Sequence, residues 1–291
     1  MRRFFPFVSF LLPVAFLLAC SKVPSTPVLQ GKGIPHWMEL PETTPDSGLD
    51  FYSRGCKIGD KTFRNYSFYW DYSNRVSHWV AYPLNSSYFG NAKRSEAWGY
   101  DPLLPAAKQQ NVSGGYRIKG TVFYQRGQQL PSSDRTANEE INATTFYGTI
   151  TVPMNDDLIN NVWQTLEGKI RSWARVSDTL YVVSGCVVEG SATSVLDRSG
   201  EDITVPVAFY KAVLRYSKND TVGTSGYMGA AFWYDHEGNH PTFEKKQSMS
   251  IAALEKKLGY GLFVNLPRVT GESAAETIKN ENPASKNWWW Q

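Results

Sequence analysis

The sequence lacks the features that most directly indicate a function. Its 291 residues carry 30 basic and 27 acidic side chains, a formal net charge of +3. A charge this small does not indicate a nucleic-acid-binding protein, so such binding would need a local basic patch. Only three cysteines and four histidines are present, which leaves few side chains for thiol or imidazole chemistry. No internal repeat is visible, so a repeat architecture is not indicated.

Long apolar runs are also missing. The run at residues 4–19 holds only 16 residues, fewer than the roughly 20 that a membrane-spanning helix needs. It follows Arg2 and Arg3, an arrangement typical of a signal peptide. The run leads into Leu-Leu-Ala-Cys, which resembles the bacterial lipobox, in which the cysteine becomes the lipidated first residue of the mature chain. We therefore predict a signal peptide at residues 1–19 and acyl chains on Cys20. The alternative is an ordinary signal peptide in which Cys20 is incidental.

This export signal predicts a lipoprotein of the bacterial cell envelope, anchored in the outer membrane and facing the periplasm or the exterior. Without Arg2 and Arg3 the mature chain has 28 basic residues against 27 acidic ones, a net charge of +1. Its only further cysteines are Cys56 and Cys186, which could form a disulfide in an oxidising compartment. Cys186 lies within the apolar run LYVVSGCVV and could instead be a buried free thiol.

Composition divides the mature chain into three parts. Residues 20–50 are rich in Pro, Thr and Ser, which is typical of a tether behind the anchor. A domain at residues 51–270 and a tail at residues 271–291 follow. Within the domain, runs of aromatic and β-branched residues alternate with clusters of Gly, Asn, Asp and Ser, which predicts strands joined by turns. These runs are RNYSFYWDY, HWVAYPL, TVFYQ, ATTFYGTITVP, TLYVVSGCVV, PVAFYKAVLRY and GYMGAAFWYD.

Two segments have helical spacing. At residues 157–174 apolar side chains recur every three or four positions, and Asn155 or Asp156 is available as the N-cap. The segment SIAALEKKL predicts a second, shorter helix between Ser250 and Gly259. The expected fold class is α+β, a central antiparallel sheet with helices laid on it.

Six segments carry a more specific signal: WVAYPL at 79–84, EAWGYDPLLP at 96–105, RGQQLPSSDR at 126–135, ATTFYGT at 143–149, VWQTLEGKIRSWA at 162–174 and LYVVSGCV at 180–187. In this order they resemble the DNA/RNA non-specific endonuclease family, the ββα-metal (His-Me finger) group related to endonuclease G. The similarity runs from about residue 65 to about residue 266. It implies a ββα-metal nuclease-like fold with a central antiparallel sheet flanked by helices.

The resemblance also implies a chemistry. In that family a loop written Asp-Arg-Gly-His carries the general base, and an asparagine near the start of the following helix binds a divalent metal. Attack of water on a phosphodiester needs a proton acceptor and a cation against the leaving oxygen. Histidine, with an ordinary pKa of about 6.5, suits the first role. A hydrated magnesium ion held by few protein oxygens suits the second.

In this sequence the loop reads Gln125-Arg126-Gly127-Gln128. The resemblance therefore places Gln128 at the base position and Gln125 at the aspartate position. A carboxamide can orient water but cannot accept its proton at ordinary pH. Loss of a general base typically costs roughly 10²–10⁴ in rate, about 3–5 kcal/mol of barrier.

The metal positions have also changed. When the helix is aligned on the Trp and Glu of WQTLE, the metal asparagine falls on Ile159, and a second family asparagine falls on Ile150. Neither side chain has a ligand atom. A shifted register would offer Asn160 instead, but that residue lies about 100° around the helix from the family position. Of the family's polar set, only Arg126 and Glu167 remain.

Arginines could still bind a phosphate backbone, because family members contact it through such residues without reading bases. The candidates are Arg75, Arg94, Arg126, Arg135 and Arg171. We assign nucleic-acid binding first to Arg75, Arg126 and Arg135. The alternative is that Arg126 and Arg135 hold the loop by pairing with Asp134 or Glu167.

Two further motifs are less specific. His236 and His240 are spaced like a metal-binding pair, but without a third ligand nearby a solvated turn is expected. The sequence Trp-Trp-Trp at residues 288–290 could stack on bases or a partner. The more ordinary expectation is that it folds back over an apolar surface or forms a loose tail.

Loss of the base, its partner and the metal ligands together favours a non-catalytic lipoprotein that binds nucleic acid, a glycan or an envelope protein through the old cleft. On this hypothesis no cofactor is expected. One alternative is an active endonuclease that hydrolyses extracellular DNA or RNA with Mg²⁺ or Mn²⁺. Another is a structural lipoprotein whose partner uses a different face.

Overall fold

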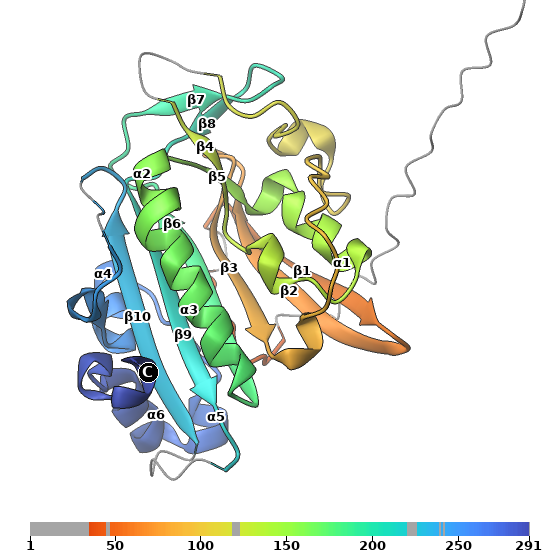
Figure 1. Ribbon diagram of the computed structural model, residues 1–291. Coiled ribbons are helices and arrows are strands. Elements are labelled where there is room, and N and C mark those ends of the chain that lie inside the picture. The colour runs from red at the N-terminus through yellow and green to blue at the C-terminus, as the bar shows by residue number, and fades with distance from the viewer. Residues whose placement is uncertain are drawn as a thin grey trace, which may run out of the picture.

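A computed structural model describes residues 35–44, 47–117, 123–219, 226–238, 240 and 242–290. Its centre is a seven-stranded antiparallel sheet with the order β1-β2-β3-β6-β9-β10-β11 (Figure 1). These strands are β1 (Leu49–Ile58), β2 (Lys61–Asp71), β3 (Val76–Leu84), β6 (Thr179–Val187), β9 (Ala208–Tyr216), β10 (Tyr227–Asp235) and β11 (Ser248–Met249). Two short hairpins lie outside it, β4 (Gln125–Gln128) with β5 (Thr151–Met154), and β7 (Ser194–Leu196) with β8 (Asp202–Thr204).

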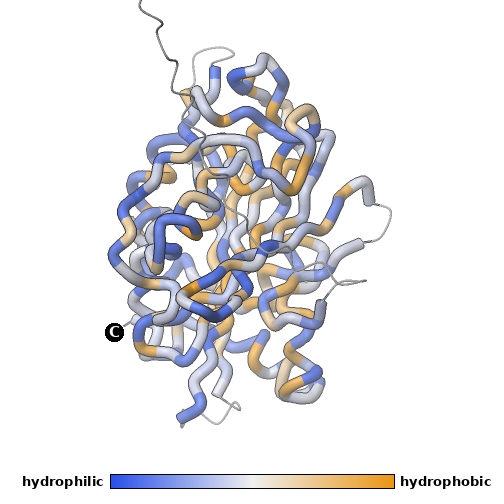
Figure 2. Tube along the Cα trace, turned by 90° about the vertical axis from the view of Figure 1, so that its right-hand side faces the viewer, coloured by the Kyte–Doolittle hydropathy of each residue, from blue (hydrophilic) through white to orange (hydrophobic). Residues whose placement is uncertain are grey.

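Helices cover both faces of this sheet. They are α1 (Glu139–Ala143), α2 (Asp156–Leu158), α3 (Gln164–Arg175), α4 (Ile251–Leu258), α5 (Pro267–Thr270) and α6 (Glu272–Asn280). In Figure 1, α3 crosses the near face of the sheet, whereas α4 and α6 lie behind β10. Figure 2 shows the most hydrophobic segments concentrated within the body of the molecule. Among the described residues, no helix is both long and apolar enough to cross a membrane.

The central strands are apolar on both sides because each face has its own core. Along β9, Phe209 and Val213 pack into the core under α3, whereas Tyr210, Ala212 and Leu214 pack into the core under α4 and α6. Successive side chains of a strand point to opposite faces, so a strand covered on both faces is apolar at nearly every position. The expected α+β fold with a central antiparallel sheet is therefore confirmed.

Both predicted helices form. The first is continuous from α2 through a π-helical turn, Ile159–Trp163, into α3, and the Asn155 side chain accepts the hydrogen bond of its N-cap from Leu158 N. The second is α4, capped at its start by Ser250. It ends at Gly259, whose φ of 77° is the left-handed conformation that glycine adopts without strain.

The run ATTFYGTITVP is only partly a strand. Its second half contributes Thr151–Met154 to β5, but residues 144–150 form two short 3-10 turns after α1. The reason is local: the Thr144 and Thr145 hydroxyls donate to the carbonyls of Ile141 and Asn142, three residues earlier, and so hold helical turns. The β-branched composition therefore favoured the wrong secondary structure here.

Of the two alternatives for the cysteines, the disulfide does not form, because Cys56 and Cys186 are both buried free thiols. Cys56 lies on β1 and Cys186 on β6, with β2 and β3 between them. Neighbouring strands lie about 4.8 Å apart, so the two Cα atoms are separated by at least about 14 Å, beyond the roughly 7 Å that a disulfide spans. The Cys186 thiol instead donates to the Ser77 carbonyl at 3.3 Å.

Both predicted boundaries of the domain also need correction. Within the expected tether, Met38 and Leu40 are buried in the core under α4 and α6. Glu39 is buried too and pairs with Arg64 at 2.8 Å. The expected tail forms α6 and ends with Trp289, which is fully buried. The body of the protein thus reaches from about residue 35 to residue 290, and the predicted cleavage and lipidation sites lie outside the described residues.

Candidate active site

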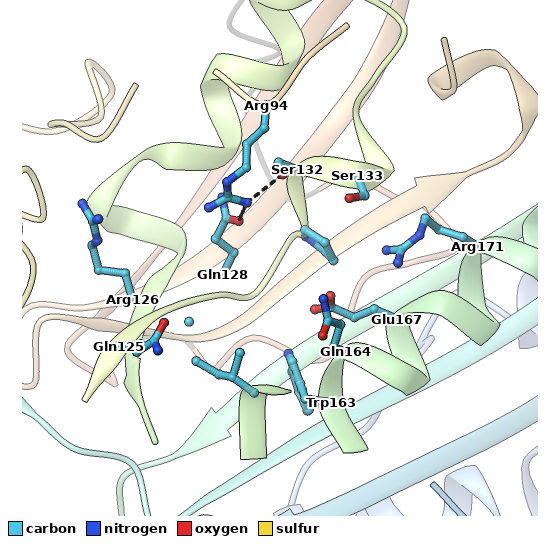
Figure 3. Close-up of a pocket in the computed structure, with 13 residues that line it drawn as sticks. Arg94, Gln125, Arg126, Gln128, Ser132, Ser133, Trp163, Gln164, Glu167 and Arg171 are labelled. Carbon is cyan, nitrogen blue, oxygen red and sulfur yellow. Dashed lines mark hydrogen bonds between the residues drawn. The ribbon is translucent and has the colours of Figure 1, made fainter. Parts of the chain in front are cut away.

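The pocket around residues 125–128 is built by the β4–β5 pair and the helix that follows it. β4 pairs antiparallel with β5, so that Gln125 lies opposite Met154 and Gln128 opposite Thr151. Gly127 is needed at this crossing because a Cβ there would lie 2.8 Å from the Met154 Cβ. The helix that follows completes a pocket of about 210 Å³ (Figure 3). It is lined by Arg94, Gln125, Arg126, Gly127, Gln128, Pro131, Ser132, Ser133, Ile159, Trp163, Gln164, Glu167 and Arg171.

The amide at the base position is held from both ends. Its Nε2 donates to the Thr145 carbonyl at 2.6 Å, and its Oε1 accepts from Arg94 Nη1 at 3.0 Å. The same Arg94 nitrogen lies 3.0 Å from the Ser132 hydroxyl, and both contacts are drawn in Figure 3. Gln128 therefore neither accepts a proton nor turns freely toward a ligand. Gln125 and Gln128 line the same pocket as Arg126 and Glu167.

Arginines supply most of the charge of this pocket. The Arg94 guanidinium pairs with Glu96 and lies over the Phe146 ring, 4.8 Å from its centre. The Arg126 guanidinium lies 3.9 Å from the centre of the Trp98 ring and donates to the Val112 carbonyl at 3.0 Å. Burial lowers the pKa of Arg126, although nearby Glu96 opposes the shift. Stacking on rings fixes these guanidinium groups and leaves them charged.

A third arginine is fixed by a buried acid. Arg171, on α3, donates to the Asp134 carboxylate at 3.1 Å. The other oxygen of Asp134 accepts from the Tyr82 hydroxyl at 3.2 Å. Burial raises the pKa of Asp134, and Arg171 opposes that shift. The ion pair thus orients Arg171 at the wall of the pocket.

Glu167 lies at the floor of the pocket, 14% exposed, with the buried Lys211 ammonium 3.9 Å away. Lys211 donates to the Ser184 hydroxyl at 3.0 Å and lies 4.2 Å from the centre of the Trp163 ring. Burial raises the pKa of Glu167 to about 7, while Lys211 opposes the shift. Burial also lowers the pKa of Lys211. Burial therefore shifts both pKa values away from those of an exposed Glu and Lys, that of Glu167 upward and that of Lys211 downward.

The residues of this pocket do not fit a divalent metal ion. Ile159, at the family ligand position, lines the pocket but offers no ligand atom. A cation would meet three arginines, and the one carboxylate of the pocket already faces Lys211. The one or two free carboxylates that usually hold a hydrated Mg²⁺ ion are therefore missing from this pocket. Within the described ranges, no three His, Cys, Asp or Glu side chains are grouped so that they could hold a metal. We therefore assign no metal to these residues.

The second family ligand position and the shifted-register alternative both lie outside the pocket. Ile150 is fully buried in the core under α3, so the second family position does not reach the site. Asn160 is exposed and is not among the residues that line the pocket. The π-helical turn at Ile159–Trp163 does not bring Asn160 into the site, so the shifted register offers no ligand.

Two of the three arginines assigned first to nucleic-acid binding are placed elsewhere. Arg135 is fully buried, stacks on Tyr88 at 4.2 Å and bonds Asn65 through its side-chain and main-chain oxygens. Arg75 pairs with Glu201 at 2.8 Å and is not among the residues that line the pocket. Only Arg126 of that set faces the pocket, together with Arg94 and Arg171. Arg135 does contact Asp134, one of the partners that the alternative named, but it donates to the main-chain carbonyl at 2.9 Å and not to the carboxylate.

The late histidines are not in a solvated turn, so that expectation is wrong. His236 and His240 are both buried. His236 Nδ1 donates to the Pro206 carbonyl at 2.6 Å, and Nε2 accepts from the main-chain N–H of Asn155 at 2.9 Å. His236 therefore fixes Asn155, the N-cap of α2, and so stabilises the start of the helix that lines the pocket.

Sequence reasoning missed Lys211. A lysine in the middle of the apolar run PVAFYKAVLRY was a usable signal, because a lysine is rarely fully buried unless it is paired. Its partner, Glu167, was predicted, but from the sequence alone the two residues are separated by a strand and a hairpin. The Trp-Trp-Trp segment does fold back, as expected: Trp289 packs edge-on against Trp173, with ring centres 4.8 Å apart.

Comparison with known proteins identifies the family and the fold. A family model of DNA/RNA non-specific endonucleases matches residues 47–269. A curated protein from Nostoc sp. (strain PCC 7120), named nuclease, is 35% identical over 149 residues, which are 51% of this chain and 52% of that protein. The chain thus matches only about half the length of this relative. A chain from the crystal structure of the EndoG/EndoGI complex aligns with a TM-score of 0.54 at 18% identity, over 70% of this chain and 85% of that one.

The antiparallel hairpin, the helix and the pocket between them define a ββα-metal nuclease fold, which the structural match supports. The chain belongs to the DNA/RNA non-specific endonuclease family, because the match covers most of its length.

Proposed function

We propose that this protein is a lipid-anchored, non-catalytic member of the family that binds the phosphodiester backbone of nucleic acid in the β4–β5–α3 pocket. One observation carries the proposal: at the base position stands a carboxamide whose two polar atoms are both held by protein groups. Such a side chain provides no proton acceptor.

Three arginines give the same pocket a positive wall. Arg94, Arg126 and Arg171 are each fixed by a ring or an acid, so little side-chain freedom is lost when they meet a phosphate. These contacts read charge and backbone geometry but not base sequence. We therefore expect binding to single-stranded and double-stranded nucleic acid with little sequence preference.

The anchor is proposed from the sequence, with acyl chains on Cys20 and a location in the outer membrane. The fold favours access to the pocket in that setting. The N-terminal segment around Met38 packs on the sheet face opposite α3 and the pocket. A chain that leaves the domain on that side keeps the pocket directed away from the anchor.

A second candidate is a member of the family that still cleaves. Glu167 favours it, because a carboxyl whose pKa is raised to about 7 can accept a proton near neutral pH. An envelope protein is a competing candidate partner; the solved EndoG structure, which shares the fold, is likewise a complex with another protein, EndoGI.

A gel-shift titration tests the proposal. Purified protein is titrated into labelled DNA and RNA at rising salt, once with EDTA and once with Mg²⁺ or Mn²⁺. We expect retarded but intact nucleic acid under both conditions, with affinity that falls as salt rises because counterions are released. EDTA-sensitive fragments that disappear in an Arg94→Ala variant would favour the second candidate. Absence of any shift at low salt would favour an envelope-protein partner.

A further inference from the structure

Glu167 is the only acid among the described residues that line the pocket. It faces a set of donors and cations, and Figure 3 shows its carboxylate beside the Gln164 amide and below the Arg171 guanidinium. The Lys211 ammonium lies 3.9 Å from its carboxylate. An ionised Glu167 therefore opposes an anionic ligand and at the same time neutralises Lys211.

The groups around Glu167 come from every element packed against it. The charged and titratable ones are Lys211 on β9, Arg171 on α3, Asp134 in the 3-10 turn Ser132–Asp134, Arg94 in the loop after β3, and Tyr82 on β3. The two carboxylate oxygens of Asp134 already accept hydrogen bonds, one from Arg171 and one from the Tyr82 hydroxyl. The Lys211 side chain cannot move away from Glu167, because it is fully buried between Ser184 and the Trp163 ring. A proton on Glu167 therefore leaves the Lys211 charge without its counter-ion while both remain in place.

We propose that Glu167 is a proton-controlled affinity residue of this pocket, which opposes a phosphodiester while it is ionised and favours it once it is protonated. Protonation of Glu167 removes the negative charge that repels a phosphodiester, and it leaves the Lys211 ammonium free to attract that ligand. It also turns one carboxyl oxygen of Glu167 into a hydrogen-bond donor. This inference rests on the proposed binding of nucleic acid, and it adds a preference for mildly acidic conditions.

The pH window follows from the site. The pKa of Glu167 is raised to about 7 by burial, so the free protein gains the proton as pH falls through that value. A bound anion raises the pKa of Glu167 further, and the affinity must then rise as pH falls, by at most about tenfold per pH unit for one proton. A phosphodiester keeps its single charge over this range. None of the described histidines lines the pocket, so none supplies the effect.

Fluorescence anisotropy with a labelled oligonucleotide of roughly 12 nucleotides tests this inference. The full-length protein is held in detergent with EDTA at constant ionic strength, and its dissociation constant is measured between about pH 6 and about pH 8.5. For the wild type we expect about tenfold tighter binding at the acidic end. Glu167→Gln should bind tightly at both ends, with less than about a twofold difference.

Gln164→Glu is the matched control. Gln164 lies about one turn before Glu167 on the same helix and also lines the pocket, but it is exposed. A carboxylate there stays ionised throughout the range, so the variant should bind more weakly at every pH and keep the wild-type ratio between the two ends. Superimposable thermal melts establish that the variants are folded.

The outcomes separate the two proposals. A wild-type ratio below about twofold, or a Glu167→Gln variant that keeps the wild-type ratio, would overturn the role of Glu167 and leave nucleic-acid binding intact. Absence of wild-type binding at every pH would remove the proposed function itself. If Glu167→Gln does not fold, a ¹³C titration of the wild-type Glu167 carboxyl decides: its pKa should rise when the oligonucleotide is added, and an unchanged pKa contradicts the inference.

Discussion

Gln128 is fixed by contacts that a catalytic histidine would have to break or replace. Its oxygen meets Arg94 and its nitrogen meets Thr145, so the amide has become part of the wall of the pocket. The contact also restricts Arg94, because it helps to hold the guanidinium group over the Phe146 ring. The glutamine therefore does more than remove a base: it orients one of the three cations that we assign to ligand binding.

Restoring the missing groups tests whether the rest of the pocket still supports catalysis. We predict that Gln125→Asp, Gln128→His and Ile159→Asn together give weak, metal-dependent cleavage of plasmid DNA, because they return a base, its partner and a ligand to one site. A single base contributes roughly 10²–10⁴ in rate, so a rise of that order over wild type is expected. The control carries Gln125→Asn, Gln128→Asn and Ile159→Leu, which should remain silent. Equal cleavage by both triple variants would contradict the assignment.

Ile150 should be left unchanged in that repair. It is fully buried in the apolar core, so Ile150→Asn places an amide where no partner is available. We predict that adding it to the repaired triple variant lowers the free energy of unfolding by about 3 kcal/mol without raising cleavage. Urea denaturation of the two variants measures the difference. A gain in activity on adding Ile150→Asn would show that this position reaches the site after all.

His236 predicts a pH dependence of stability. Burial lowers its pKa in the folded protein, so the unfolded chain takes up the proton first as pH falls below about 6.5. The stability that His236 contributes is therefore present above that pH and is lost below it. Glu167 acts in the opposite sense, because its raised pKa makes the folded protein take up the proton first.

Because Glu167 is present in both proteins, we predict the difference in unfolding free energy between wild type and His236→Asn. Relative to wild type, His236→Asn should cost more stability at about pH 8 than at about pH 5.5, because only the wild type loses the favourable neutral imidazole on acidification. Urea denaturation at both pH values checks this. A cost that does not change with pH would mean that the imidazole does not stay neutral in the fold.

Single residues were predictable from the sequence only where a motif fixed them. Gln125, Arg126, Gln128 and Glu167 do line one pocket, because β4 pairs with β5 and the helix that carries Glu167 follows β5 directly. Arg135 was not predictable, because its neighbours in sequence do not reveal that it points under the loop toward Asn65 rather than into the cleft.

At the scale of elements, the C-terminal segment shows how a presumed tail becomes part of the core. Trp289 is fully buried against Trp173, the last aromatic residue of the site helix. We predict that Trp289→Ala lowers the free energy of unfolding by about 3–5 kcal/mol, through the lost burial and the cavity. Asn287→Ala, at an exposed position two residues earlier, should change it by less than about 0.5 kcal/mol. Urea denaturation checks both, and equal effects would contradict this packing.

Elements with a strong period were predictable, and elements set by side-chain hydrogen bonds were not. The site helix followed from its apolar spacing and its Asn155 cap. The turns at residues 144–150 did not, because their threonines bond to the preceding carbonyls instead of joining a strand. Helix α6 was missed because its buried residues, Ala275 and Ile278, are too few to produce a clear pattern.

At the scale of the whole molecule, the two faces of the sheet have separate roles. One face carries α3 and the pocket, and the other carries α4, α6 and the docked N-terminal segment. Composition alone could not place the start of the domain, because Pro, Thr and Ser also occur in segments that pack. The contact of Leu40 with the sheet core, and its carbonyl bond to Val264 N, decide that boundary.

The anchor makes a prediction for the whole molecule. In cells that process lipoproteins, wild type should fractionate with membranes, and Cys20→Ala should be released or remain unprocessed, because stable attachment depends on the acyl chains. The variant should bind nucleic acid as tightly as wild type, since the pocket lies on the opposite side of the sheet from the N-terminal segment. Membrane fractionation followed by anisotropy checks both halves. A Cys20→Ala protein that is processed and still sediments with membranes would contradict the anchor.

The central claim is that the pocket holds a phosphodiester but cannot cut it, and a single incubation tests it most directly. Labelled DNA is mixed with saturating wild-type protein in Mg²⁺ or Mn²⁺, and complex and fragments are separated on native and denaturing gels. The account predicts a retarded complex on the first gel and full-length DNA on the second, with Arg171→Ala weakening only the complex. Metal-dependent fragments that vanish in Glu167→Gln would contradict it.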